Sequence, residues 1–180
     1  PAVISPLSDD DGARFKRGLL VHRLLQSLPD IALDEREARA KVFLARPSLE
    51  LEAKEQEALL AETLSVLGDP DHADLFGPGS MAEVPITGIV GDPETGQVLT
   101  GQVDRLLVTK DAVIVIDFKT NRPPPETEHD VAPAYLRQMA AYQAALAQVY
   151  PDRPVRAVLL WTLGPRLMPL SDEILAAHAP

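Results

Sequence analysis

The chain has 180 residues, of which 46% are hydrophobic, and its 17 Lys and Arg against 27 Asp and Glu give a net charge of −10. This length and composition are ordinary for one globular domain with a buried core, so we expect a single domain over residues 1–180. Cysteine is absent, which excludes disulfide bonds, Cys-ligated zinc and Cys-held iron–sulfur clusters. A bound metal would need oxygen or imidazole ligands.

The acidic balance also bears on possible partners. Phosphate contacts are normally made by a basic face, so a net charge of −10 argues against a stand-alone nucleic-acid binder. No apolar run approaches the roughly 20 residues that cross a bilayer, and the start PAVISPLSDD lacks the regions of a signal peptide. We therefore expect a soluble, cytoplasmic protein with no membrane partner. Because the sequence begins with Pro1 rather than Met and ends with Pro180, we also expect a piece of a longer polypeptide.

The first part of the chain has the spacing of helices. Apolar residues in GARFKRGLLVHRLLQSL recur at helical intervals until Pro29 stops the pattern. Two more helical stretches follow, and the second ends at Gly68 with Pro70 beyond it, as helix C-termini often do. The predicted helices cover about 12–28, 34–46 and 49–67, and a loop rich in Asp, Gly and Pro follows at 68–80.

After Ser80 the pattern changes to segments rich in β-branched residues. Three such segments, separated by the hairpin turn GDPETG and by Lys110-Asp111, predict a three-stranded meander. A Pro-rich surface connection, 121–133, leads into a helix, and an apolar strand follows that helix. The predicted strands are 82–90, 98–109, 112–120 and 155–163, with the helix at 134–149 and a short helix at 171–178.

This order of elements predicts an α/β fold with a mixed β-sheet. The fourth strand is reached by a helical crossover, so it should lie parallel to the third. The sheet core is expected over about 81–165, flanked by helices, with an N-terminal helical part over about 12–67.

Two aspartates lie in the predicted hairpin of the second and third strands. If Thr109 opposes Ala112, then Asp104 opposes Asp117, which puts both carboxylates on one face with Cβ atoms roughly 4.5 to 5.5 Å apart. Like charges placed in this way repel, so a cation between them would stabilise the pair. Alternation along the strand puts Lys119 on the same face as Asp117.

These three residues suit hydrolysis of a phosphodiester. Carboxylates that share Mg²⁺, beside an ammonium that positions water or stabilises developing charge, are the minimum equipment for it. The alternatives are an edge-strand charge pair of Asp117 with Lys119, or a salt bridge from Asp104 to Arg105 or Arg122. The segment VIVID has the composition of a buried strand, where an unpaired carboxylate is costly, and this favours a site.

Several motifs resemble a known family. GQVDRL followed by VIVIDFKT is similar to the GxxD and DxK core of PD-(D/E)xK nucleases. A G-x-x-x-H pattern from Gly18 to His22 and a Q-x-x-x-Y pattern from Gln138 to Tyr142 resemble the RecB-type branch, over about residues 12–165. Within that branch the chain looks like the C-terminal nuclease domain of AddA-type helicase-nucleases. The absence of cysteine disfavours the related forms that hold an iron–sulfur cluster.

The resemblance implies a restriction-endonuclease-like fold and a metal-dependent DNA exonuclease in double-strand break processing and recombinational repair. It implies Mg²⁺ as the cofactor, with Mn²⁺ able to substitute. The implied partners are DNA, a helicase portion of the same polypeptide and a second nuclease subunit. The implied metal ligands are His22, Asp104, Asp117 and the backbone carbonyl of Phe118, and the implied catalytic residues are Asp104, Asp117, Lys119, Gln138 and Tyr142.

Some of these residues have a simpler interpretation. On sequence alone, His22 among leucines is more typical of a core histidine than of a ligand, and only the resemblance favours a ligand. Glu83 resembles a family glutamate near the metal but could equally be a charge at the start of a strand. Gln138 and Tyr142 share a helix face, as residues of any amphipathic helix do. We expect the other histidines to be solvated: His72, His129 and His178.

The alternative function is a catalytically silent DNA-binding or assembly module of the same fold.

Overall fold

The structure of the chain is a computed structural model that describes residues 9–90 and 97–179. Three helices come first, and strands with one long helix follow. The helices are α1 (Asp9–Ser27), α2 (Leu33–Leu44), α3 (Ala53–Gly68), α4 (Pro133–Val149) and α5 (Asp172–Ala176). The strands are β1 (Ser80–Val90), β2 (Gln97–Val108), β3 (Val113–Lys119), β4 (Val155–Trp161) and β5 (Arg166–Pro169).

The strands form one mixed sheet in the order β1-β2-β3-β4-β5. All neighbours are antiparallel except β3 and β4, which are parallel and are joined by the crossover helix α4. The predicted meander, crossover and parallel fourth strand are therefore confirmed. The edge strand β5 was not expected, because its four residues RLMP follow Pro165 and end in Pro169, and proline argues against a central strand. An edge strand tolerates proline, since one side of its backbone is unpaired.

The predicted register of the β2–β3 hairpin is also confirmed. The Thr109 amide donates to the Ala112 carbonyl over 2.9 Å, and the ladder runs from Val108↔Val113 to Arg105↔Ile116. In this antiparallel ladder one residue back along β2 matches one residue forward along β3, so the next position is Asp104 opposite Asp117. The predicted turn at 91–96 lies outside the described residues.

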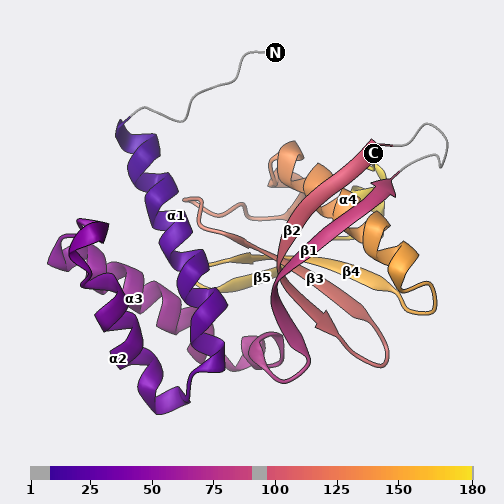
Figure 1. Cartoon of the computed structure of the whole chain (residues 1–180). Helices are drawn as coiled ribbons and strands as arrows, with labels where there is room; N and C mark the ends of the chain where they lie inside the picture. The colour runs from indigo at the N-terminus through magenta and orange to yellow at the C-terminus, as the bar shows by residue number, and fades with distance from the viewer. Residues whose placement is uncertain (1–8, 91–96, 180) are drawn as a thin grey trace.

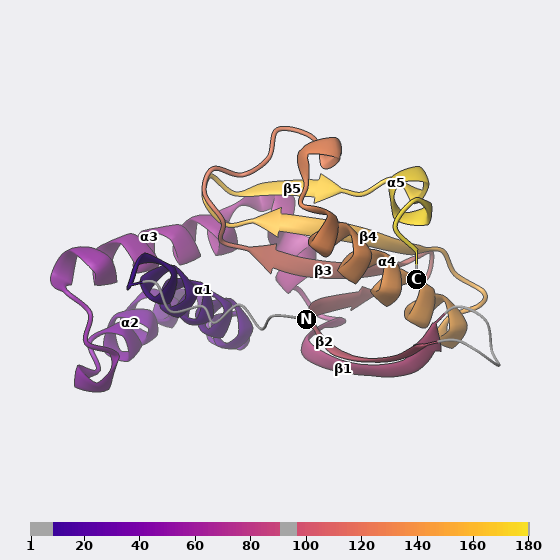
Figure 2. The same ribbon diagram turned by 90° about the horizontal axis from the view of Figure 1, so that it is seen from above.

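Helices cover both faces of the sheet (Figures 1 and 2). On one face α4 and α5 pack over alternate residues of β3, including Val113 and Val115, and on the other face α1 and α3 pack over Ile116 and Phe118. Ile116 and Phe118 are both buried in the core on this second face. The end of β3 thus lies between α1 on one side and α4 on the other.

Two local expectations were wrong in the helical part. The stretch 68–80 is not all loop, since residues Pro70–Phe76 form a 3₁₀ helix. His72 within it is buried rather than solvated, with Nδ1 3.1 Å from the Val66 carbonyl oxygen, which satisfies a ring nitrogen away from water. His178 is half-buried, with Nδ1 2.8 Å from the Ile174 carbonyl oxygen, whereas His129 is exposed as expected.

The third helix starts at Ala53 rather than at 49 because Glu52 and Glu55 form a capping box there. Within residues 9–90 and 97–179, none of the helices is long and apolar enough to cross a bilayer.

Candidate active site

Three acidic residues lie in one row across β1, β2 and β3. The two registers put Glu83 opposite Asp104, and Asp104 opposite Asp117. Both ladders lack their pair in this row. In the β1–β2 ladder the flanking pairs Ala82↔Arg105 and Val84↔Val103 are present. The ladder pairing of the sheet is therefore interrupted at the row of these three acidic residues.

The Asp104 carboxylate replaces the missing strand contact. Its Oδ2 accepts a 2.6 Å hydrogen bond from the Phe118 backbone amide, and its Oδ1 lies 3.2 Å from His22 Nδ1 on α1. One side chain thus joins β2, β3 and α1, and it explains why β2 and β3 stop pairing one position before the row.

Asp117 and Lys119 form an ion pair in the interior at the end of β3. Their side chains are only 6% and 10% exposed, and Asp117 Oδ2 lies 2.5 Å from Lys119 Nζ. Despite that short distance, no hydrogen bond of normal geometry from the described residues reaches Asp117 Oδ2, so this oxygen is buried and incompletely satisfied. Burial raises the pKa of Asp117, and the charge of Asp104 adds to this, while Lys119 opposes both.

The described contacts of Asp104 and Asp117 bear on the simpler interpretations of these aspartates. Asp117 and Lys119 do pair, but β3 is the central strand of the sheet and not an edge. Arg105 donates to the Leu75 carbonyl and to Ser80, and Arg122 donates to Glu62. Neither arginine is an ion-pair partner of Asp104 in the described contacts, so Asp104 keeps its carboxylate for His22 and for the Phe118 amide.

Helix α4 holds Lys119 from the other side. Lys119 Nζ donates to Gln138 Oε1 over 3.2 Å, Gln138 Nε2 donates to Tyr142 Oη over 3.2 Å, and Tyr142 donates to the Gln102 carbonyl over 3.0 Å. This chain of hydrogen bonds links the lysine to the backbone of β2. The close approach of Tyr142 to β2 needs glycine at position 101, because a Cβ there would lie 2.9 Å from Tyr142 Oη.

The sequence interpretation missed Tyr135. Its ring centroid lies 3.9 Å from Lys119 Nζ, and its hydroxyl donates to Asn121 over 3.0 Å. An ammonium over an aromatic face is attracted by the ring quadrupole. A signal was present, because Tyr135 precedes Gln138 by three residues and Tyr142 by seven, a spacing that puts all three on one helix face.

His22 faces the site and is not a core histidine. Its side chain is 30% exposed, and its ring makes an edge contact with Phe118 at 5.7 Å between centroids. Burial alone would lower the pKa of His22, but the hydrogen bond and charge of Asp104, together with the charge of Asp117, raise it above the ordinary value. Gly18 lets α1 approach, since a Cβ at this position would lie 3.0 Å from Thr120 Oγ1.

Glu83 has an unusual backbone. Its φ of 53° is in the left-handed region, which non-glycine residues seldom adopt and which often marks functional sites. Partial burial raises the pKa of Glu83, and the charge of Asp104 contributes, while His22 and Arg23 oppose the shift. Glu83 therefore lies within electrostatic reach of Asp104 and His22.

The donor set can be tested for a divalent cation. Among the described residues, no three side chains of His, Asp or Glu converge as a group that could hold a metal ion. The types of donor fit nonetheless: two carboxylates and one imidazole are hard or borderline ligands, and Asp117 Oδ2 is buried without a hydrogen bond of normal geometry from the described residues. The residues match a divalent cation in chemistry, although the side chains are not gathered around one point.

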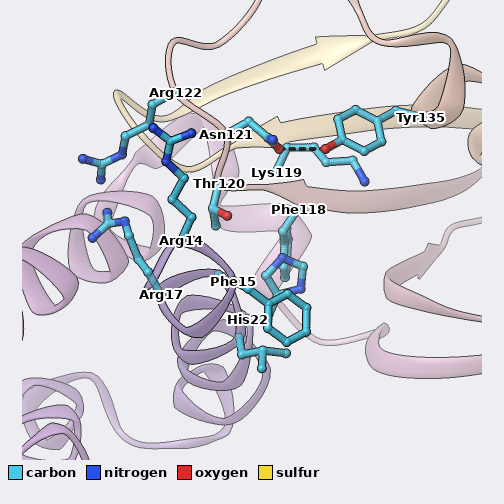
Figure 3. Close-up of a pocket in the computed structure, with 12 residues that line it drawn as sticks. Arg14, Phe15, Arg17, His22, Phe118, Lys119, Thr120, Asn121, Arg122 and Tyr135 are labelled. Carbon is cyan, nitrogen blue, oxygen red and sulfur yellow. Dashed lines mark hydrogen bonds between the residues drawn. The ribbon is translucent and has the colours of Figure 1, made fainter. Parts of the chain in front are cut away.

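A pocket of about 510 Å³ opens beside this row, between α1 and the segment that follows β3 (Figure 3). Its lining includes residues that contact the site: His22, Phe118, Lys119 and Tyr135. Solvent and a ligand can therefore reach the lysine and the histidine from the same side.

The mixed sheet with its α4 crossover, covered by helices and bearing a buried Asp–Lys pair at the end of β3, defines a restriction-endonuclease-like α/β fold. The chain belongs to the PD-(D/E)XK nuclease superfamily, whose family model matches residues 4–169. This membership indicates a nuclease, an enzyme that hydrolyses phosphodiester bonds of nucleic acid.

Two other comparisons add little. The comparison with curated proteins gives no match. Among solved structures, the chain is similar to the crystal structure of SSO0001, with 14% identity and a TM-score of 0.36. That match covers 92% of this chain and 82% of the other, and at this TM-score it carries no argument about function.

Proposed function

We propose that this chain is a metal-dependent DNA exonuclease domain. The observation that supports this most is the buried ion pair of Asp117 and Lys119 beside Asp104. A hydrolase needs such a constellation, whereas a structural core is destabilised by it, because buried charges are costly unless they are fully paired.

Each proposed site residue has a distinct task. We propose that His22, Asp104, Asp117 and the Phe118 carbonyl hold Mg²⁺, for which Mn²⁺ can substitute. A bound divalent ion supplies a Lewis acid for a phosphoryl oxygen and lowers the pKa of water.

Lys119 carries three N–H donors that can steady the attacking water or the charge that develops on phosphate. Its compact ammonium suits this task, and Gln138 and Tyr135 fix its position, while Tyr142 fixes Gln138. Pre-organised charge of this kind lowers the barrier because little rearrangement is needed during the reaction.

The wider role is proposed from the resemblance to the RecB-type branch and to AddA-type nuclease domains. In this proposal the domain processes double-strand breaks for recombinational repair in the cytoplasm, with a helicase portion of the same polypeptide and a second nuclease subunit. The net charge of −10 supports such an arrangement, because a domain with few phosphate contacts of its own depends on neighbours to deliver DNA.

A cleavage assay tests the activity. Linear DNA is incubated with the chain and Mg²⁺ or Mn²⁺, with excess chelator, and with Asp104→Asn in place of the parent. We expect degradation only by the parent with metal. Full turnover in chelator would remove the metal from the mechanism, and no cleavage by the parent in any metal would favour a catalytically silent DNA-binding module.

A further inference from the structure

The outer wall of the pocket is basic although the chain as a whole is acidic. Arg14 and Arg17 reach it from α1, and Arg122 reaches it from the segment after β3. Figure 3 shows these three arginines together on one side of the pocket, away from the rings of Phe15, His22 and Phe118. Three cations at one wall create a local positive potential that net charge alone does not reveal.

A buried glutamate holds two of these arginines in place. Arg17 and Arg122 both contact Glu62 Oε2, the latter over 2.7 Å, and Thr162 donates to Glu62 Oε1 over 2.5 Å. The carboxylate is 4% exposed and contacts both guanidinium groups, so Arg17, Arg122 and Glu62 together carry one net positive charge. Arg122 is 46% exposed and keeps donors on the solvent side.

The pocket also has two exposed apolar side chains, those of Phe15 and Leu19. The side chain of Phe15 is 61% exposed and that of Leu19 is 56% exposed, one helical turn apart on α1. Both line the pocket, whereas Phe118, which also lines it, is buried. An aromatic face that stays in water beside arginines is the combination on which proteins stack the bases of a nucleic-acid strand.

We propose that this pocket is a nucleotide subsite that positions the DNA strand next to Lys119. In this subsite, Arg14 and Arg122 bind a backbone phosphate, and the Phe15 ring stacks on the adjoining base. The proposal rests on the proposed nuclease function and adds residues to it that make no contact with the acidic row in the described structure. A volume of about 510 Å³ is in the range of pockets that hold small molecules of nucleotide size.

Binding without cleavage tests the proposal. Fluorescence anisotropy in excess chelator and low salt is measured with a labelled oligo(dT) strand of about 12 nucleotides, a length typical of such sites, and with an abasic phosphodiester strand of equal length. Phe15→Ala should weaken oligo(dT) binding about tenfold and leave the abasic strand unchanged, because only the base stacks. Arg14→Gln and Arg122→Gln should each weaken both strands and lower the salt slope by about 0.7.

Matched controls come from α2. Leu33→Ala removes another exposed apolar side chain, and Arg39→Gln removes another exposed arginine, which pairs with Glu35. Neither should change binding. Because Arg122→Gln removes a partner of Glu62 and could unfold the chain, Arg14→Gln, at an exposed position, gives the phosphate result independently.

The outcomes separate the two proposals. Equal binding by the parent and the Phe15 and Arg14 variants overturns the subsite, even if the parent cleaves DNA. An equal loss on both strands with Phe15→Ala overturns the stacking and hence the subsite as stated. The expected binding pattern in a parent that never cleaves DNA supports the subsite and contradicts the proposed nuclease.

Discussion

The two ends of β3 differ in chemistry although both are buried. At the start, Val113 and Val115 pair with β2 and pack under α4. At the end, Asp117 and Lys119 are charged, and the ladder to β2 has stopped, while pairing to β4 continues through Lys119↔Trp161. At the charged end β3 is therefore paired to β4 along its backbone, while β2 contacts it through the Asp104 side chain.

This difference separates stability from function along one strand. The apolar end gains free energy from burial, whereas burying two charges costs more than a pair at the surface would. The fold retains the charged end because neighbouring elements hold it: the Asp104 carboxylate of β2 accepts from the Phe118 amide, and Gln138 of α4 accepts from Lys119. Substitutions at the two ends should therefore have opposite effects.

Lys119→Ala should produce the largest effect. Cleavage should fall by roughly 100-fold or more, the usual loss when a group that stabilises the transition state is removed. Metal affinity in calorimetry should stay nearly unchanged, because the ammonium is not a ligand. Lys119→Arg should rescue poorly, since a planar guanidinium cannot replace a compact charge at fixed reach.

The other end of the same hairpin supplies the control. Lys110→Ala removes an exposed lysine from the turn and should leave cleavage at the parental rate. Loss of metal binding in Lys119→Ala would assign this lysine a structural role, and full activity of Lys119→Arg would contradict the argument from shape.

Gly101→Ala tests the hydrogen-bonded support of the lysine. The added Cβ would lie 2.9 Å from Tyr142 Oη, so the tyrosine must move, which breaks its contact with the Gln102 carbonyl or with Gln138. Overpacking of this kind costs about 1–3 kcal/mol, which denaturant unfolding can measure. Gly88→Ala on β1 is the matched control, because its Cβ would make an ordinary 3.8 Å contact with Ala145. Equal stability of the two variants would show that Tyr142 does not constrain β2.

Asp117→Asn should stabilise the metal-free protein or leave its stability unchanged at pH 7. The pKa of Asp117 is raised in the folded state above its ordinary value of 3.8. The protonated form is thus favoured by folding, and its contribution is lost as pH rises through the raised pKa. Asparagine has no carboxyl group to ionise, so the variant does not lose this stability at pH 7. We expect its free energy of unfolding to be about 1 kcal/mol higher than that of the parent, or its Tm about 2–4 °C higher.

Val115→Ala at the apolar end should instead lose about 2 kcal/mol, because it leaves a cavity in the core. The difference in Tm between the parent and Asp117→Asn should become smaller at pH values near 3.8, because the carboxyl group of the parent becomes protonated in both the folded and the unfolded state. Thermal melts at both pH values provide the measurement. A loss of several kcal/mol in Asp117→Asn at pH 7 would mean that the ion pair with Lys119 outweighs desolvation.

The sequence predicted the strands of this site because their signals are local. Alternation in VIVIDFK and the Lys110-Asp111 turn determine which residues oppose each other, and the hairpin register followed correctly from them. The contacts of Glu62 with Arg122 and Thr162 join segments 60 and 100 residues apart. Pattern alone cannot predict such contacts, since they depend on how α1, α3 and α4 pack. The left-handed φ of Glu83 was also unpredictable, because glutamate gives no local signal for it.

Metal addition tests whether the row of carboxylates binds a cation. A ligand that binds only the folded state stabilises it by RT ln(1 + [L]/Kd), so about 10 mM Mg²⁺ with a Kd on the order of 1 mM contributes about 1.4 kcal/mol. For a chain of this size the Tm should rise by about 3–5 °C. Asp117→Asn should lose most of this rise, because one of the two opposed carboxylates is gone. Asp111→Asn, which removes an exposed carboxylate at the turn, should keep the full rise. An equal rise in all three proteins would place the cation elsewhere, and a rise in none would show that the repulsion between Asp104 and Asp117 is relieved by Lys119 and His22 alone.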